Sequence, residues 1–247
     1  MWFKYFQYLL ITLMFSACSP KHYGITSYKT SFVAIKDTIP HEMEIVDFLN
    51  YYKTSLDSVM DQVIGITQIP LSKSQPESTL GNFAADAQLE AGKRLDNLVS
   101  ISVVNYGGLR IPYVPKGSIT RGRVYEIMPF DNMLTIIDIP GDVLRQFCNH
   151  MAKLKGWPIA GASYVIEAGK ANDIKVNGLA IKDNQTYKLV TSDYIANGGD
   201  DCYFLVKLKQ YPYSVFLRDA LIEKIVNDSK KDSGIYPKIE NRVVYAE

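Results

Sequence analysis

The chain is organised around Asn197-Gly198-Gly199-Asp200-Asp201, which follows the strand-like run Thr186-Tyr187-Lys188-Leu189-Val190-Thr191. Two adjacent glycines allow the backbone to take a positive φ or to approach a ligand closely. Tyr194 supplies an aromatic ring just before this stretch, and Asp200 supplies a carboxylate within it. Such groups suit a ligand that joins a flat ring to a hydroxylated one. They also suit a Gly-Asp turn between two strands, and this stretch alone favours the turn.

The composition is that of a folded protein with balanced charge. Of the 247 residues, 47% are apolar and 21% charged, which provides a sizeable core for one large domain or two small ones. The 27 Lys and Arg residues nearly match the 26 Asp and Glu residues. A protein that binds nucleic acid needs a basic excess, so no nucleic-acid partner is expected.

The N-terminus has the pattern of an export signal. Lys4 precedes an apolar run from Tyr5 to Phe15 that is too short to span a bilayer comfortably. Small residues before Cys18 resemble a bacterial lipobox, although Phe15 stands where leucine is usual. We therefore expect residues 1–17 to be removed as a lipoprotein signal peptide and Cys18 to be lipidated. The alternative is a plain secretory signal with an incidental cysteine.

A lipidated Cys18 would place the protein on a membrane. Three acyl chains anchor a protein stably. Ser19 is not the Asp that typically retains lipoproteins in the inner membrane, so we expect the outer membrane, on its periplasmic face. Residues 18–39 are predicted to form a lipidated tether and a first strand region.

Hydrophobic periodicity predicts interleaved helices and strands. Apolar residues at steps of three and four from Ile45 to Val63 predict a long amphipathic helix that begins near Pro40 and ends at Gly65. Further helices are predicted at 80–92, 141–154 and 215–226. Strands are predicted at 66–71, 98–104, 133–139, 163–167, 173–176, 186–191, 203–208 and 242–245, with a tight turn at 177–178. We therefore predict an α+β fold: a single domain over residues 40–247 with a mixed β-sheet packed by helices.

The residues do not suggest catalysis within this chain. The histidines His22, His41 and His150 have no ligand spacing, so no metal or other cofactor is expected here. His150 is interpreted as a surface or packing residue. Cys148 and Cys202 are candidates for a disulfide or, by default, small buried hydrophobes. No Gly-x-Ser-x-Gly elbow or phosphate-binding loop is present.

Binding is better supported, because three loops at predicted strand ends carry recognition groups. These loops are 105–110, 129–132 and 194–201. Phe130 and Tyr194 are expected to sandwich a planar base, worth about 1–3 kcal/mol by analogy with other aromatic platforms. Asp200 would accept hydrogen bonds from a ribose diol, and Arg110 would pair with phosphate or ribose oxygens. Taken one at a time, each of these residues has an ordinary structural explanation.

Four segments in order resemble motifs of the 5'-nucleotidase C-terminal domain. They are Glu77-Ser78-Thr79-Leu80-Gly81-Asn82-Phe83-Ala84-Ala85-Asp86-Ala87, Asn105-Tyr106-Gly107-Gly108-Leu109-Arg110, Met128-Pro129-Phe130-Asp131-Asn132 and Tyr194-Ile195-Ala196-Asn197-Gly198-Gly199-Asp200. These motifs lie between residues 77 and 200, and the resemblance extends over about residues 40–227. The resemblance implies a domain that recognises the nucleoside part of a substrate, while a separate metallophosphoesterase domain carries the metals and the catalytic residues.

The resemblance also implies roles for individual residues. Phe130 and Tyr194 would stack on the base, Asn105 would bind near the base or sugar, and Arg110 and Asp200 would hold ribose hydroxyls. The full set expected to bind substrate is Asn105, Gly107, Gly108, Arg110, Phe130, Tyr194, Asn197, Gly198, Gly199 and Asp200.

The sequence departs from the family pattern in three places. Pro76 stands where the family commonly has arginine, with Lys73 as the nearest cation. Tyr194 replaces phenylalanine and adds a hydroxyl. Asp131 replaces glycine and puts a carboxylate beside Phe130, which would disfavour a phosphate there.

The sequence therefore predicts the nucleotide-recognition component of a 5'-nucleotidase. It would act in nucleotide catabolism, the hydrolysis of nucleoside monophosphates, with a metallophosphoesterase supplied by another chain, and would be inactive alone. One alternative is a non-catalytic lipoprotein that scavenges nucleosides or nucleotides. Another is a structural or adhesive lipoprotein that retains only the fold.

Overall fold

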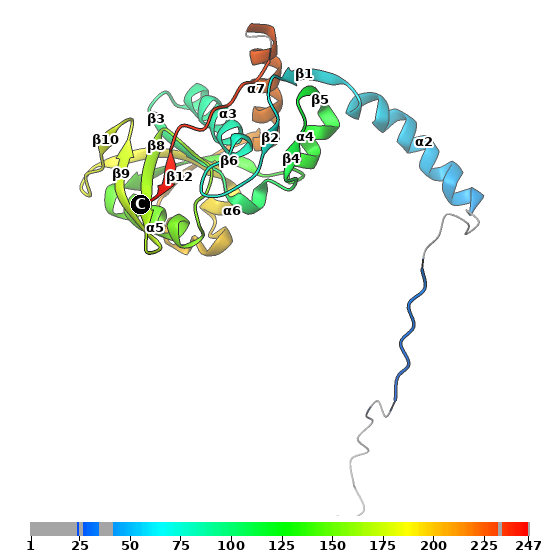
Figure 1. Ribbon diagram of the computed structural model, residues 1–247, viewed down its shortest axis with the longest axis horizontal. Coiled ribbons are helices and arrows are strands. Elements are labelled where there is room, and N and C mark those ends of the chain that lie inside the picture. The colour runs from blue at the N-terminus through cyan, green and yellow to red at the C-terminus, as the bar shows by residue number, and fades with distance from the viewer. Residues whose placement is uncertain (1–23, 25–26, 35–41, 232–233, 247) are drawn as a thin grey trace, which may run out of the picture. The chain divides into compact units, whose positions relative to one another are not determined.

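The computed structural model in Figure 1 describes Gly24 and residues 27–34, 42–231 and 234–246. The chain divides into two units, residues 1–47 and 48–247, and every strand of the described residues lies in the second.

The predicted signal peptide and Cys18 lie outside the described residues, as does most of the first strand region predicted within 18–39. Residues 27–34 are described, and they form no strand. Tyr28 and Phe32 in this segment are exposed. Alternating apolar residues make a strand only where a neighbouring strand supplies hydrogen-bond partners, and no strand among the described residues pairs with 27–34.

A five-stranded mixed sheet forms the centre of the second unit. Its strand order is β12-β6-β11-β3-β7. β11 pairs antiparallel with β6 and parallel with β3, while the edge strands β12 and β7 are antiparallel to their neighbours. The bounds are β3 Val99–Val103, β6 Met133–Pro140, β7 Ile159–Ala160, β11 Thr186–Ser192 and β12 Lys209–Phe216.

A second sheet has four strands in the order β10-β9-β8-β13. The predicted Asn177-Gly178 turn is present between β9 and β10, and both of its residues have positive φ, 49° and 79°. The strands are β8 Ala162–Glu167, β9 Lys170–Val176, β10 Leu179–Ala180 and β13 Val243–Tyr245. Two small ribbons pair β1 (Val63–Thr67) with β5 (Gly117–Thr120) and β2 (Leu71–Ser72) with β4 (Tyr113–Val114).

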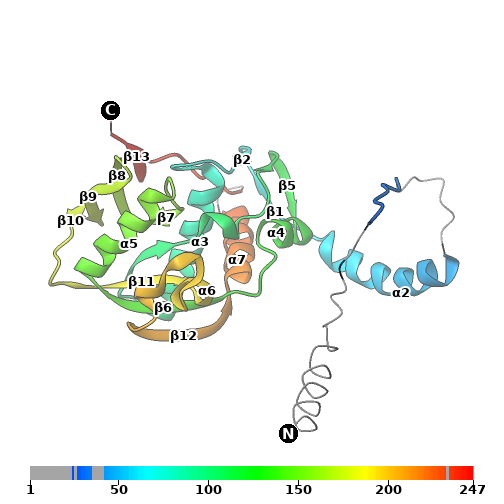
Figure 2. The same cartoon turned by 90° about the horizontal axis from the view of Figure 1, so that it is seen from below.

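Helices and the second sheet cover the two faces of the central sheet. Leu134 and Ile136 of β6 belong to a core shared with α3, α4 and α7, whereas Ile137 and Ile139 belong to a core shared with α5 and the second sheet. Figure 2 shows α5 beside β9, and α7 beside α3. Side chains of β6 thus point alternately into the two cores, because successive residues of a pleated strand face opposite sides of the sheet. The predicted α+β class is confirmed.

The helices of this unit are α3 Thr79–Leu95, α4 Arg121–Ile127, α5 Gly141–Lys153, α6 Asp193–Ala196 and α7 Leu217–Lys231. Short 3₁₀ turns are η1 Tyr106–Gly108, η2 Gly199–Asp201 and η3 Tyr203–Leu205. Cys148 and Cys202 are both free and buried, so they are small buried hydrophobes, and burial raises the pKa of each thiol to about 12.

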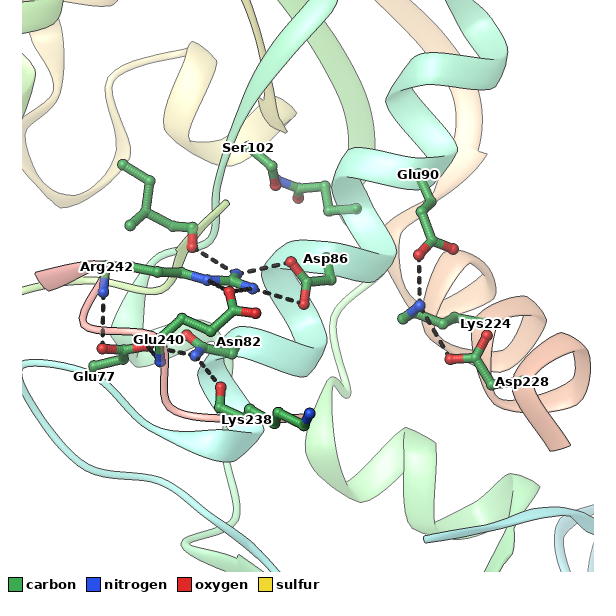
Figure 3. A network of polar contacts seen from close by, with 12 residues as sticks. Glu77, Asn82, Asp86, Glu90, Ser102, Lys224, Asp228, Lys238, Glu240 and Arg242 are labelled. Atoms are coloured by element: carbon green, nitrogen blue, oxygen red, sulfur yellow. Dashed lines mark hydrogen bonds and ion pairs between the residues drawn. The ribbon is translucent and has the colours of Figure 1, made fainter. Parts of the chain in front are cut away.

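The C-terminal segment is bound to the start of α3 by a polar network (Figure 3). The Arg242 guanidinium donates to both carboxylate oxygens of Asp86, at 2.7 and 3.0 Å. The Glu77 carboxylate accepts from the backbone N–H groups of Glu240 and Arg242 and from the Asn82 side chain. Polar side chains of the segment 77–87 therefore hold residues 240–242 against α3.

Two glycines that the sequence assigned to helix ends serve a different purpose. Gly65 lies inside β1, where a Cβ would come within 2.3 Å of Ser229 Oγ. α3 continues past Gly92, where a Cβ would come within 2.8 Å of a Val190 methyl group. Neither glycine terminates its helix; each permits close approach between elements that are distant in sequence.

The region after Asp201 also differs from expectation. Residues 203–208, predicted as a strand, begin with the turn η3, and β12 follows at 209–216, where no strand was predicted. Pro212 lies in β12, and proline is tolerated there because β12 is an edge strand. α4 was also missed; Thr120 caps it by accepting a hydrogen bond from the Arg123 N–H.

The long amphipathic helix is confirmed as α2, Met43–Met60, although it ends before Gly65. None of its residues is buried. Nowhere in the described parts of the chain is a helix both long and apolar enough to cross a membrane.

Candidate functional site

Three strand ends meet at one edge of the central sheet. β3 and β11 are parallel, so the residues that follow them, from Asn105 and from Asp193, emerge at the same edge. β6 runs antiparallel to β11, and Leu134 pairs with Ser192, so the loop before β6 lies at this edge too. The sheet topology thus brings together the three loops that the sequence singled out.

A pocket of about 280 Å³ lies among these loops. It is lined by Asn105, Gly107, Gly108, Arg110, Phe130, Asn132, Tyr194 and Asp200. Its volume is near the lower end of the range for small-molecule sites. Asn132 belongs to this lining and was absent from the expected set, although it lies within the quoted motif.

Three residues of the expected set do not line the pocket. They are Asn197, Gly198 and Gly199. Gly198 has a φ of 95°, which favours glycine, and it turns the chain after α6. A Cβ on Gly199 would lie 2.5 Å from the Tyr194 ring, so the missing side chain makes room for that ring. Gly198 and Gly199 therefore shape the backbone behind the pocket wall.

Asp200 is the polar centre of the site. Its Oδ2 accepts a hydrogen bond from Asn105 Nδ2 at 2.8 Å, and its Oδ1 accepts one from the Tyr194 hydroxyl at 2.8 Å. The bond to Asp200 raises the pKa of the Tyr194 hydroxyl. These hydrogen bonds join Asn105, which follows β3, to Tyr194 and Asp200, which follow β11, in one wall of the pocket.

Arg110 and Phe130 line the pocket with Asp200. The Arg110 guanidinium carbon lies 5.8 Å from the centroid of the Phe130 ring, within range of a cation–π contact. Arg110 Nη1 lies 3.4 Å from the Gly107 carbonyl oxygen and donates to it. The Phe130 and Tyr194 side chains are 40% and 45% exposed, which leaves ring surface for a ligand.

Arg218 is a supporting residue that sequence reasoning missed. It is buried on α7 and donates to the Phe130 carbonyl at 3.2 Å and to Asp131 Oδ1 at 2.6 Å. Its guanidinium carbon also lies 4.0 Å from the Tyr125 ring centroid. Arg218 thus fixes the loop that carries Phe130. Asp131, whose carboxylate the sequence predicts to disfavour a phosphate beside Phe130, forms an ion pair with Arg218.

Lys73 does not line the pocket. Its Nζ donates to the Leu109 carbonyl at 2.7 Å and lies 4.0 Å from the Tyr106 ring centroid. Burial lowers the pKa of Lys73, and the nearby Arg110 lowers it further. Lys73 therefore supports the loop after β3 from outside the pocket.

A larger open cleft of about 510 Å³ lies elsewhere, along β10 and β11. Two of its charged groups, Lys188 and Asp138, form an ion pair at 2.9 Å, and Lys182 also lines it. None of the residues that the sequence predicts to bind substrate lines this cleft, so it is a weaker candidate than the smaller pocket.

Among the residues that the structure covers, no group of three or more His, Cys, Asp or Glu side chains is placed to hold a metal ion. No step of a reaction is therefore assigned here to a metal.

Comparison with known proteins gives a consistent relationship. The chain is 28% identical over 243 residues to the trifunctional nucleotide phosphoesterase protein YfkN of Bacillus subtilis, covering 86% of this chain and 16% of that protein. It is 23% identical over 275 residues to the mouse 5'-nucleotidase, covering 98% and 46%. A crystal structure of a 5'-nucleotidase precursor from Thermus thermophilus matches with a TM-score of 0.71 and 25% identity, covering 84% and 44%.

The chain spans less than half the length of each of these relatives. The family model described as the 5'-nucleotidase C-terminal domain matches residues 60–207, which is more than half of the chain and includes all three pocket loops. The chain therefore belongs to the 5'-nucleotidase C-terminal domain family.

Proposed function

We propose that the pocket binds the nucleoside part of a nucleotide. The observation that carries the proposal is the convergence of Asn105, Arg110, Phe130, Tyr194 and Asp200, from three loops, on one pocket. The rings offer stacking surface to a base. The Asp200 carboxylate has acceptor capacity beyond its bonds to Asn105 and Tyr194, and this capacity suits a ribose diol. Arg110 supplies positive charge for ribose oxygens or a phosphate.

Hydrolysis of the bound nucleoside monophosphate is proposed to need a metallophosphoesterase on another chain. This chain would present the nucleotide, and its partner would supply the metals and the attacking water. The support is that the residues described by the structure hold no group of three or more His, Cys, Asp or Glu side chains placed to bind a metal ion. Without the partner, the purified chain should release no phosphate from AMP.

We also propose that Cys18 carries the lipid anchor, which places the domain on the periplasmic face of the outer membrane. The support is the lipobox-like sequence. Palmitate labelling that persists in a Cys18→Ala variant would contradict the anchor without touching the nucleoside proposal.

Isothermal titration calorimetry with adenosine, AMP and a panel of other bases tests the binding proposal. Tyr194→Ala should weaken adenosine binding about 5- to 150-fold, because it removes a stacking ring. Tyr236→Ala is the matched control, since Tyr236 is similarly exposed, at 53%, and does not line the pocket. No heat with any nucleoside or nucleotide, or equal affinity for both variants, would refute the proposal.

A second measurement distinguishes presentation of a nucleotide to a catalytic partner from non-catalytic scavenging. Phosphate release from AMP is assayed with the chain, with a metallophosphoesterase encoded beside it, and with both together. Synergy supports presentation to a catalytic partner. Binding without synergy supports a non-catalytic lipoprotein that scavenges nucleosides or nucleotides.

A further inference from the structure

His150 contacts the candidate site from outside the pocket. It lies on α5 and belongs to a separate open groove of about 490 Å³ that also includes Gln146, Asn149 and Asp201. Its Nε2 is 2.9 Å from the backbone carbonyl oxygen of Asp200. A carbonyl oxygen only accepts hydrogen bonds, so Nε2 carries the proton and donates.

The imidazole ring is held on two sides by aromatic residues. The Trp157 centroid lies 5.7 Å away at an interplanar angle of 90°, and the Phe204 centroid lies 5.8 Å away at 65°. Edge-to-face contacts of this kind restrict ring orientation. The Nε2–H bond is therefore aimed at Asp200 by packing within the protein, independently of any ligand.

Asp200 needs such support because its backbone is in the left-handed region, with φ 49° and ψ 41°. This conformation is uncommon for a residue with a Cβ, although aspartate adopts it more readily than most, and contacts to its peptide groups help to maintain it. Besides His150, the Asp200 carbonyl receives only a weak contact from Cys202 Sγ, at 3.8 Å, among the hydrogen bonds recorded for the described residues. The strong donor to this peptide group is thus His150.

We propose that His150 is a positioning residue for nucleoside binding. By holding the Asp200 peptide, it fixes the direction of the carboxylate that also bonds to Asn105 and Tyr194 and that faces the ribose hydroxyls. This inference rests on the proposed function of the pocket. It adds that ribose recognition depends on a residue that touches no ligand.

Two variants separate the hydrogen bond from the packing. His150→Phe keeps an aromatic ring between Trp157 and Phe204 and removes the donor. His150→Gln keeps a side-chain N–H donor. Gln146→Ala is the control, because Gln146 is exposed on the same helix and lines the same groove. Thermal unfolding of all variants checks that each one is folded.

Calorimetry with adenosine and 2',3'-dideoxyadenosine measures the effect on ribose recognition. His150→Phe should weaken adenosine binding about 3- to 10-fold, the effect of one hydrogen bond, and should leave dideoxyadenosine affinity within twofold. His150→Gln and Gln146→Ala should bind both ligands within about twofold of the wild type.

The outcomes distinguish this inference from the function on which it rests. Wild-type protein that binds neither ligand refutes both. Wild-type protein that binds adenosine, together with His150→Phe that binds it equally well, refutes only the positioning role. Equal weakening for the two ligands also refutes that role, since it indicates a general loss of structure. Amide NMR shifts of Asp200 and Asp201, which should change in His150→Phe and not in Gln146→Ala, provide a readout without ligand.

Discussion

The Tyr194 hydroxyl lies 2.8 Å from Oδ1 of Asp200 and donates a hydrogen bond to it, while the Asp200 N–H donates back to the same hydroxyl at 3.2 Å. The aromatic wall and the acidic group of the pocket are therefore one bonded unit. Gly199 has no side chain to displace the Tyr194 ring from this position. The sequence resemblance implies phenylalanine at this position, so the hydroxyl is one of the departures of this chain from the motif.

Tyr194→Phe tests that unit. The ring remains, but Asp200 loses a donor that orders its carboxylate, so adenosine binding should weaken about 3- to 10-fold. Binding of free adenine, which lacks ribose, should stay within twofold. Calorimetry measures both affinities, with Tyr236→Phe as the control. Unchanged adenosine affinity would show that the hydroxyl does not organise the site.

Arg218→Lys tests the support of the Phe130 loop. Lysine keeps the charge but lacks the planar fork that reaches both Asp131 and the Phe130 carbonyl. The variant should lose about 1–3 kcal/mol of unfolding free energy, measured by urea denaturation, and should bind adenosine less tightly.

The control for Arg218 is Arg94→Lys on α3, whose partner Glu223 lies on α7. That ion pair is about half exposed on both sides, so its loss should change stability by less than about 1 kcal/mol. If Arg218→Lys weakens adenosine binding in a Phe130→Ala background as much as in the wild type, Arg218 does not act through Phe130.

Arg242→Leu tests the attachment of the C-terminal segment. It leaves the Asp86 carboxylate mostly buried without its bidentate partner, which should cost about 3–5 kcal/mol of unfolding free energy at pH 7. Nucleoside affinity of the folded variant should not change, because neither residue lines the pocket. The double variant Asp86→Leu/Arg242→Leu should recover part of the loss, and failure to recover would show that the charge of Asp86 is not its cause.

The Arg242→Leu deficit should also depend on pH. Burial raises the pKa of Asp86, and the Arg242 bonds oppose that rise. Without Arg242 the ionised carboxylate is penalised, so the variant loses stability as the pH rises above the ordinary carboxyl range of about 4. Urea denaturation at pH 4 and pH 7 should therefore show the smaller deficit at pH 4, and equal deficits would contradict this explanation.

Asp138→Asn tests the ion pair with Lys188 on the central sheet. The Lys188 hydrogen bond, with help from the Tyr211 hydroxyl, lowers the pKa of Asp138. A lowered carboxyl pKa gives stability that is present above the unfolded value, about 3.9, and is lost as the pH falls through the folded value. The variant should be about 1 kcal/mol less stable at pH 7, and this difference should shrink below pH 3.

The control for Asp138 is Asp183→Asn, which breaks a more exposed pair with Arg145. Its effect on stability should be close to zero at both pH values. A difference between wild type and Asp138→Asn that stays constant from pH 7 to pH 2 would exclude the ion pair as its source.

Local pattern was informative wherever one signal dominated. The apolar periodicity of α2, the continuous run of β3 and the Asn177-Gly178 turn all predicted the observed elements. Residues that are compatible with two different local structures did not predict the observed one. Glycine permits both a chain reversal and a close approach, and only the neighbours Ser229 and Val190 show that Gly65 and Gly92 serve the second purpose.

Short-range pattern and motif were enough to predict the class of fold, the family and the three loops of the pocket. The residues that support those loops could be identified only from long-range contacts. Arg218 and His150 lie on α7 and α5, far along the chain from Phe130 and Asp200, and neither belongs to a motif. Their roles arise because strand pairing brings the loops to one edge of the sheet, where long-range packing supplies donors to backbone carbonyls that no local pattern identifies.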